Sequence, residues 1–452
     1  MKRFLSIIFI LSTVATVFAQ EKKLLSIEDV SINYALYARE LPQCNWIPKS
    51  DKYAFTKGDT IQIKEANGKD YYSISLEEIN ENLEEADKLK RLPYLRWTDI
   101  MEFSYVNNNA VFTVGAGKSR EVSKVMDLPA GLANLENNLK SGNYSGTIGD
   151  HLYVNGQQVN ETKEGYVYGQ TVHRNEFGIG KGTYWSNDFS KLAFYENNQN
   201  PVSDYPMLNI TTRVAEANMI KYPMAGDANE IVRLAVYDAK TKETVYMQTG
   251  DVDQYLTNIS WGPAGKYLYI GVLNRGQDHL KWQKYDAKTG KLVKTLFEEK
   301  SESFVEPLHP LHFIPKRDNE FVWTTWKDGF THFYKYNTDG KELKQITKGA
   351  FEVKSFLGFD ASGKYIYYTS TEESPLETHL YKVSINGGRA KKITSKKGQH
   401  SLRISEKSNY IIDSYSSRAV ARKMLVLDKN GKQIQELHDA GDPLSEYVKN
   451  GV

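Results

Sequence analysis

The chain has 452 residues, of which 40% are hydrophobic and 25% are charged, and its formal net charge is +2. This composition provides enough apolar residues for a sizeable core. The near-neutral charge excludes a strong long-range field for nucleic acid or an anionic membrane surface, so neither is expected as a partner.

The N-terminal residues have the pattern of an export signal. In "MKRFLSIIFILSTVATVFAQ", Lys2 and Arg3 precede a short apolar run, and small residues at Val17 and Ala19 mark a cleavage site before Gln20. The run is too short to span a bilayer, and no later stretch reaches the ~18 apolar residues that a transmembrane helix needs. We therefore predict a signal peptide over residues 1–19 and an exported protein, periplasmic or secreted. The alternative is a buried N-terminal strand.

Residues 20–45 form a lead-in that contains Cys44, the only cysteine, so an internal disulfide is excluded. Between residues 46 and 415, eight units share one pattern: an apolar pair, a polar turn, then an alternating strand, as in "LGFDASGKYIYYTST". Alternation puts every second side chain into a core, and Asp, Ser, Gly and Lys suit the turns. A period of about 50 residues with four strands per unit is typical of a β-propeller. The sequence predicts an all-β fold, an eight-bladed propeller with antiparallel four-stranded blades over residues 46–430.

Two segments interrupt this rhythm. Residues 76–91, "LEEINENLEEADKLKR", have Leu and Ile at helical spacing and predict a charged amphipathic helix on the outside of an early blade. Residues 196–230 are a long insertion rich in Pro, Asn and Tyr, and an insertion of this length is typical of a functional loop or an interface.

Two motifs suggest chemistry but are better explained without it, and the motif of a serine hydrolase is missing. Val114–Ser119, "VGAGKS", lacks the first glycine of a phosphate-binding loop, because Phe112 stands at that position. His309 and His312 flank a proline, so a helical metal site is not expected. No G-x-S-x-G pentapeptide occurs, so the turn that exposes a hydrolase serine is missing. The sequence predicts no catalytic residues, no metal and no cofactor.

Glu176, in "VHRNEFGIG", is the one candidate binding residue, since a carboxylate that faces a cavity can pair with an ammonium group. From residue chemistry alone, a solvated loop acid is the alternative.

Four segments in fixed order resemble the N-terminal domain of the dipeptidyl peptidase IV family of serine exopeptidases, in its bacterial form. They are "VHRNEFGIGKGTYWSNDFSKLAFYENNQNPVSDYP", "IKYPMAGDANEIVRLAVYD", "ISWGPAGKYLYI" and "GQHSLRISEKSNYIIDSYS". The resemblance implies an eight-bladed propeller that restricts access to a C-terminal α/β-hydrolase domain. It also implies that Glu176 grips the free N-terminus of a peptide, although Asn175 replaces a second acid found in many members. The family's substrate-binding arginine is not assigned to Lys118 or Arg120, because the residues around them do not match.

The resemblance further implies that residues 431–452 lead towards a hydrolase domain, which we expect to be absent. The chain alone is therefore expected to be inactive, although its family consists of serine-type dipeptidyl peptidases. We consider three hypotheses: a non-catalytic, free-standing or truncated propeller that binds peptides with free N-termini; the propeller half of a split peptidase whose hydrolase-domain chain is separate; and an unrelated peptide-, protein- or sugar-binding propeller. A homodimer is a further expectation.

Overall fold

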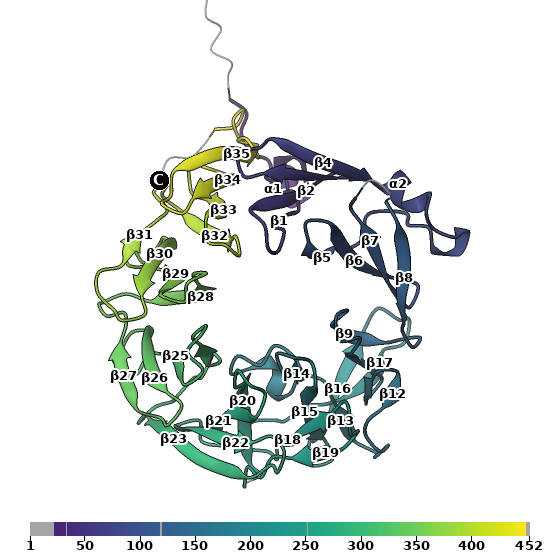
Figure 1. Ribbon diagram of the computed structural model, residues 1–452, viewed down its shortest axis with the longest axis vertical. Helices are drawn as coiled ribbons and strands as arrows, with labels where there is room; N and C mark the ends of the chain where they lie inside the picture. Colours follow the sequence, from purple (N-terminus) through teal and green to yellow (C-terminus); the bar gives the residue numbers. More distant parts are fainter. Residues whose placement is uncertain (1–21, 33, 118–119, 251, 449–452) are drawn as a thin grey trace, which may run out of the picture.

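The computed structural model describes residues 22–32, 34–117, 120–250 and 252–448, and shows a ring of eight antiparallel blades (Figure 1). The predicted fold is confirmed. The predicted signal peptide lies outside the described residues. None of the helices in the described ranges is long and apolar enough to cross a membrane.

The first four blades use strands up to Tyr246. Blade 1 contains β1 (Cys44–Trp46), β2 (Lys52–Lys57), β3 (Thr60–Glu65) and β4 (Asp70–Ser75). Blade 2 contains β5 (Arg96–Asp99), β6 (Glu102–Asn107), β7 (Ala110–Gly115) and β8 (Val122–Asp127). Blade 3 contains β9 (Ala133–Asn137), β10 (Tyr144–Ile148), β11 (His151–Val154) and β12 (Gln157–Gln158). Blade 4 has a fifth strand and contains β13 (Tyr166–Tyr168), β14 (Thr183–Trp185), β15 (Lys191–Asn198), β18 (Ile231–Asp238) and β19 (Thr244–Tyr246).

The last four blades have four strands each. Blade 5 contains β20 (Gln254–Trp261), β21 (Tyr267–Asn274), β22 (His279–Asp286) and β23 (Leu292–Lys300). Blade 6 contains β24 (His312–Phe313), β25 (Glu320–Thr325), β26 (His332–Asn337) and β27 (Glu342–Gln345). Blade 7 contains β28 (Val353–Phe359), β29 (Tyr365–Ser370), β30 (His379–Ser384) and β31 (Lys391–Lys392). Blade 8 contains β32 (Gln399–Ile404), β33 (Tyr410–Ser416), β34 (Lys423–Asp428) and β35 (Gln433–Asp439).

The core lies between neighbouring blades, because each sheet buries side chains on both faces. Between blades 5 and 6, the buried rings of Trp282 and Trp323 meet edge to face with centroids 6.0 Å apart. The turns approach the neighbouring sheets closely. Gly340, at the β26–β27 turn, has φ of +87°, and a Cβ there would lie 2.1 Å from the carbonyl oxygen of Leu296 on β23. Only glycine satisfies both conditions.

The ring closes through side chains, since blade 1 and blade 8 each come entirely from one end of the chain. The Trp46 indole Nε1 donates to the Arg403 carbonyl (2.8 Å), and the Tyr53 hydroxyl donates to Gln435 Oε1 (3.1 Å). Cys44 is buried in this seam, and burial raises the pKa of its thiol to about 12. The thiol is therefore protonated and inert at neutral pH.

The expected helix over residues 76–91 is wrong in its length. Helix α2 (Leu76–Asn80) begins with a Ser75–Glu78 capping box and is followed by the 3-10 turn η2 (Glu85–Asp87). The Asn80 side chain donates to the Leu89 carbonyl and accepts from the Leu89 amide, which holds the segment between them as a loop. Two further helical elements, α1 (Ile27–Ile32) and η1 (Tyr34–Leu36), lie before blade 1, whereas α2 and η2 lie between blades 1 and 2.

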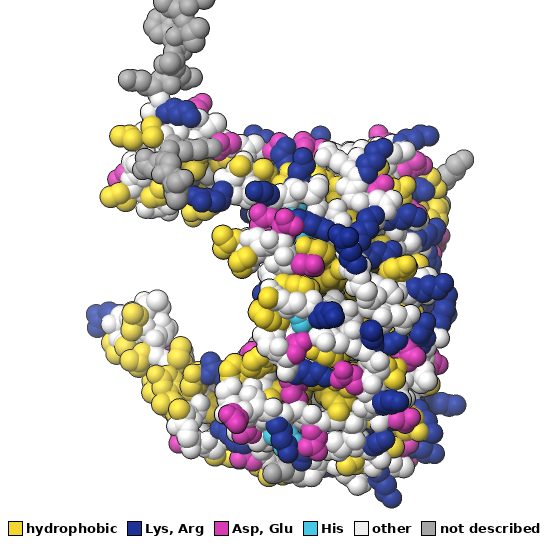
Figure 2. All heavy atoms as spheres, turned by 90° about the vertical axis from the view of Figure 1, so that its left-hand side faces the viewer, with side chains coloured by type: hydrophobic (Ala, Val, Ile, Leu, Met, Phe, Trp, Pro, Cys, Tyr) yellow, Lys and Arg dark blue, Asp and Glu magenta, His cyan; other side chains and the backbone are white. Residues whose placement is uncertain are grey.

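The insertion within blade 4 is a β-hairpin, β16 (Asp204–Asn209) and β17 (Glu216–Lys221), that pairs with no other sheet. It forms the lower projecting arm in Figure 2, which is rich in hydrophobic side chains. Its exposed apolar residues include Leu208 (65% exposed), Ile210 (80%) and Val214 (71%).

The ring of blades extends beyond the expected propeller limits of 46–430 at both ends. Strand β1 begins at Cys44, and β35, which ends at Asp439, is the fourth strand of blade 8. All the side chains of β35 are exposed or half-buried, and its sequence alternates only weakly, so its pattern does not mark it as a blade strand.

Candidate functional site

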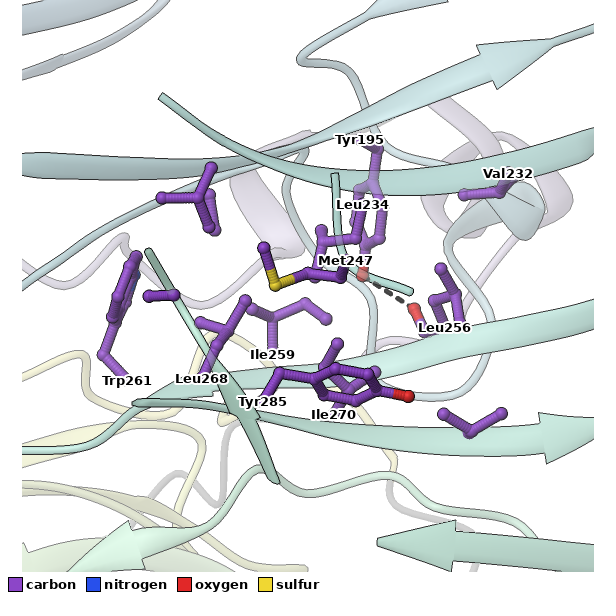
Figure 3. Close-up of a cluster of buried hydrophobic side chains, with 14 of the residues drawn as sticks. Tyr195, Val232, Leu234, Met247, Leu256, Ile259, Trp261, Leu268, Ile270 and Tyr285 are labelled. Atoms are coloured by element: carbon purple, nitrogen blue, oxygen red, sulfur yellow. Dashed lines mark hydrogen bonds between the residues drawn. The ribbon is translucent and has the colours of Figure 1, made fainter. Parts of the chain in front are cut away.

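Glu176 lies in the turn that joins β13 to β14 in blade 4. The turn is fixed at both ends, because Val172 and Ile179 are buried in the core between blades 4 and 5. Figure 3 shows the same core around Met247 and Tyr195, whose hydroxyl donates to the Leu256 carbonyl across the blade boundary (2.8 Å). The position of Glu176 therefore depends on the packing of two blades.

The backbone of this turn is strained. His173, Arg174 and Asn175, which form the 3-10 turn η3 (His173–Asn175), have φ of 51°, 55° and 62° in succession. Glu176 returns to an extended conformation with φ of −77°, and Phe177 again has a positive φ of 54°. Each non-glycine residue in the left-handed region costs about 1–2 kcal/mol, and such strain persists only where surrounding contacts enforce it. Strained residues of this kind cluster at functional sites.

Glu230, just before β18, holds the start of the turn. Its Oε1 accepts from the His173 amide at 2.9 Å and lies 3.2 Å from His173 Nδ1, and both side chains are buried. Burial opposes ionisation of Glu230, but contact with His173 outweighs it and holds the pKa of the carboxyl below its ordinary value. A buried carboxylate thus anchors the strained backbone from 57 residues away.

Two residues of β20 hold the end of the turn. The Tyr255 ring packs between His173 and Phe177, with a centroid separation of 4.8 Å to each. The buried Asn258 Nδ2 donates to the Phe177 carbonyl (3.2 Å) and to the Pro307 carbonyl (2.5 Å). Asn258 therefore ties the turn to the segment that connects blades 5 and 6.

The outer side of the turn faces the base of the hairpin. The Arg174 guanidinium lies over the ring of Tyr222, 4.3 Å from its centroid, in a cation–π contact. Glu176 is exposed, and within the described residues its carboxylate has no hydrogen bond or ion pair. A strained, well-supported turn thus presents one exposed carboxylate whose interaction with a neighbouring cation, Arg174, is electrostatic and involves no hydrogen bond or ion pair among the described residues.

The other candidate residues have structural contacts. Arg120 donates to the carbonyls of Ser73 (2.6 Å) and Ala116 (2.8 Å) and lies near Glu78, so it links blades 1 and 2. Lys118 lies outside the described residues. His312 stacks on Phe356, with centroids 3.8 Å apart, and burial lowers its pKa to about 4.

Two features typical of metal and hydrolase sites are absent from the part of the chain that the structure describes. No three His, Cys, Asp or Glu side chains there are arranged to hold a metal ion. Every pairing between the named strands is antiparallel, so the described residues contain no parallel hydrolase sheet.

Sequence reasoning found Glu176 but missed the residues that position it. Glu230, Tyr255 and Asn258 lie far from the turn along the chain and belong to strands or connections with ordinary patterns. Only the order of the "HRNEF" and "YPMAGDANE" segments hinted that the two regions belong together.

The fold and the turn define a class: an eight-bladed β-propeller that exposes a lone carboxylate beside a projecting hairpin. The model of the dipeptidyl peptidase IV (DPP IV) N-terminal region matches residues 150–422, more than half of the chain. The chain therefore belongs to the dipeptidyl peptidase IV N-terminal region family, and the predicted resemblance is confirmed.

Similar proteins agree with this assignment. A crystal structure of a putative dipeptidyl aminopeptidase IV from Bacteroides ovatus is 33% identical with a TM-score of 0.85, and the match covers 94% of this chain and 64% of that one. Porphyromonas gingivalis dipeptidyl peptidase 4, at 22% identity and a TM-score of 0.78, shares the fold over 95% of this chain and 64% of its own. Dipeptidyl-aminopeptidase B of Aspergillus niger is 30% identical over 290 residues, which is 58% of this chain and 32% of that protein. The chain thus spans about a third of the length of the curated relatives that it matches.

Proposed function

We propose that this protein is the substrate-recognising, non-catalytic propeller of a dipeptidyl peptidase, and that Glu176 binds the free N-terminal ammonium group of a peptide. The observation that carries the proposal is the strained turn, which holds an exposed carboxylate with no hydrogen bond or ion pair among the described residues. A carboxylate and an ammonium group form charge-assisted hydrogen bonds, about twice as strong as neutral ones. A solvated loop acid does not need a fixed position, whereas a strained and well-supported backbone suits a carboxylate that must be held in place to bind a ligand.

The same proposal includes a gating role. In it, the propeller ring restricts access to a serine hydrolase domain, which is either joined to this chain or carried by a separate one. The family membership supports this proposal, because the matched relatives are named as aminopeptidases and peptidases. The protein is also proposed to act after export, as the pattern of its first 19 residues indicates.

Replacing Glu176 with glutamine is expected to abolish binding of a free-ended peptide. Ligand that binds only the folded state raises stability by mass action, about 2.7 kcal/mol at a hundred times the dissociation constant. A thermal melt with Ile-Pro should therefore show a rise in Tm for the wild type and none for Glu176→Gln. N-acetyl-Ile-Pro, which lacks the ammonium group, serves as the ligand control. Equal stabilisation of both proteins by Ile-Pro would remove Glu176 from the site, and no shift in either would remove peptide binding.

We also propose that the β16–β17 hairpin pairs with the hairpin of a second copy. Its exposed apolar side chains form one projecting surface (Figure 2), and such contiguous patches mark interaction sites. The double variant Leu208→Glu/Ile210→Glu is expected to convert a dimer to a monomer in light scattering. Leu376→Glu alters a similarly exposed leucine (82% exposed) in the connection between β29 and β30 and should leave the dimer intact. A wild-type monomer at high concentration would contradict the pairing.

A further inference from the structure

A cavity of about 250 Å³ lies at blade 6, close to the Glu176 turn. It is bordered by the segment after β23 and by the turn between β25 and β26, whose strands are labelled in Figure 1. Leu308 lines it, and the Leu308 carbonyl oxygen would lie 2.4 Å from a Cβ built on Gly178. The cavity and the Glu176 turn therefore share a wall.

The charge in this cavity comes from carboxylates. Glu306 and Glu352 line it, and none of the described lining residues is Lys or Arg. His309 also lines it, but burial lowers the pKa of the imidazole, so His309 is neutral at neutral pH. A positively charged group that enters the cavity would meet two anions and no competing cation.

Aromatic rings complete the lining of this cavity. The rings of Phe304 and Trp326 lie 5.2 Å apart between centroids, and Phe304 is 49% exposed, so its ring is only partly covered. Aromatic faces attract cations within about 6 Å. The partly exposed ring of Phe304 thus gives an entering cation an aromatic surface beside the two carboxylates.

We propose that this cavity binds the cationic side chain, a guanidinium or ammonium group, of a bound peptide. The guanidinium of arginine is flat, stacks on aromatic rings and donates five hydrogen bonds, which matches the two rings and the two carboxylates. The space is enough for several waters at about 30 Å³ each, or for one flat head group that displaces them. The peptide as ligand rests on the proposed function, whereas the preference for a cation rests on the cavity alone.

The test compares N-acetyl-Arg-Pro with N-acetyl-citrulline-Pro, in which a neutral urea replaces the guanidinium at nearly the same size. Acetylation removes the ammonium group, so the comparison is independent of Glu176. In protein labelled with 5-fluorotryptophan, the ¹⁹F signal of Trp326, assigned by its loss in Trp326→Phe, reports binding. We expect the arginine peptide to bind about tenfold more tightly, since hydrogen bonds between charged groups are stronger than those of a neutral urea. Equal affinities would overturn the proposal.

Matched variants locate the preference. Glu306→Gln and Glu352→Gln should each reduce it several-fold, and glutamine at residue 352 can still accept from the Thr331 amide as the glutamate does (2.8 Å). Glu243→Gln, in the exposed turn after β18, is the control and should leave it unchanged. Loss of the preference in Glu243→Gln would show a general surface-charge effect and overturn the site.

A second ligand tests the assignment to peptides. Agmatine, which has a guanidinium group but no peptide backbone, should bind more weakly than N-acetyl-Arg-Pro. Equal binding of the two would overturn the assignment to peptides. Glu176→Gln should keep the preference for the arginine peptide, whether or not this substitution changes the binding of Ile-Pro.

Discussion

Asp413→Ala is expected to destabilise the protein by about 3–5 kcal/mol, because it leaves a buried histidine without its counter-ion. Asp413 on β33 and His400 on β32 are both buried, and the two carboxylate oxygens lie 2.8 and 3.0 Å from His400 Nδ1. His400 Nε2 lies 2.8 Å from the Lys396 carbonyl oxygen. Because both ring nitrogens face acceptors, both must donate, and the imidazole is charged.

The same pair gives stability a dependence on pH. Burial opposes protonation of His400, but the hydrogen bond and charge of Asp413 outweigh it and raise the pKa of the imidazole above 6.5. A group whose pKa is raised by folding stabilises the folded state fully below its unfolded pKa. That contribution disappears as the pH rises from 6.5 through the folded pKa. His379 lies beside His400, with ring centroids 5.1 Å apart, and burial lowers the pKa of His379 although its Nε2 lies 2.7 Å from Glu377 Oε2.

Urea denaturation at pH 6 and pH 9 measures both effects. The wild type should lose stability between the two values, and Asp413→Ala should be far less stable at pH 6. Asp413→Asn keeps the shape and one acceptor but removes the charge, so it should show a smaller loss and a flatter pH profile. Wild-type stability in Asp413→Ala at pH 6 would mean that the pair contributes little to the fold.

The propeller was predictable because its signals are local. The apolar and aromatic run of a strand such as β29, in which every residue after Tyr365 is buried, is visible in the local sequence. So are the Asn-Gly or Asp-Gly turns that follow the third strands of blades 1, 3, 6, 7 and 8. The prediction failed where distant or weakly patterned residues decide the structure. The Asn80–Leu89 hydrogen bonds shorten an otherwise plausible helix, and exposed β35 has no clear alternation.

The candidate site was predictable only in part. Glu176 was identified through a resemblance, and its role in binding stays a prediction. The strain of residues 173–177 and the anchors Glu230 and Asn258 result from contacts between blades, which no local pattern encodes. The cavity at blade 6 was not foreseen for the same reason, since its walls come from separate loops that only the ring brings together.

Gly178→Ala is expected to destabilise the protein by about 2–5 kcal/mol and to weaken Ile-Pro binding. Gly178 has φ of +73°, which costs a residue with a Cβ about 1–2 kcal/mol. The Cβ would also lie 2.4 Å from the Leu308 carbonyl oxygen, so the backbone of the turn or of the Leu308 segment must move, at about 1–3 kcal/mol. Either movement displaces Glu176, two residues away, or the cavity wall. Urea denaturation and titration with Ile-Pro measure the two effects.

Gly131→Ala separates the two causes. Gly131 has a similar φ of +76°, but nothing lies within 4 Å of a Cβ built there, so this variant should lose only about 1–2 kcal/mol and bind Ile-Pro normally. The difference between the variants then measures the close approach of the turn to Leu308. Because that approach joins the Glu176 turn to the cavity, Gly178→Ala should also reduce the preference for N-acetyl-Arg-Pro over its citrulline counterpart. Equal losses in both glycine variants would mean that the two sites are positioned independently.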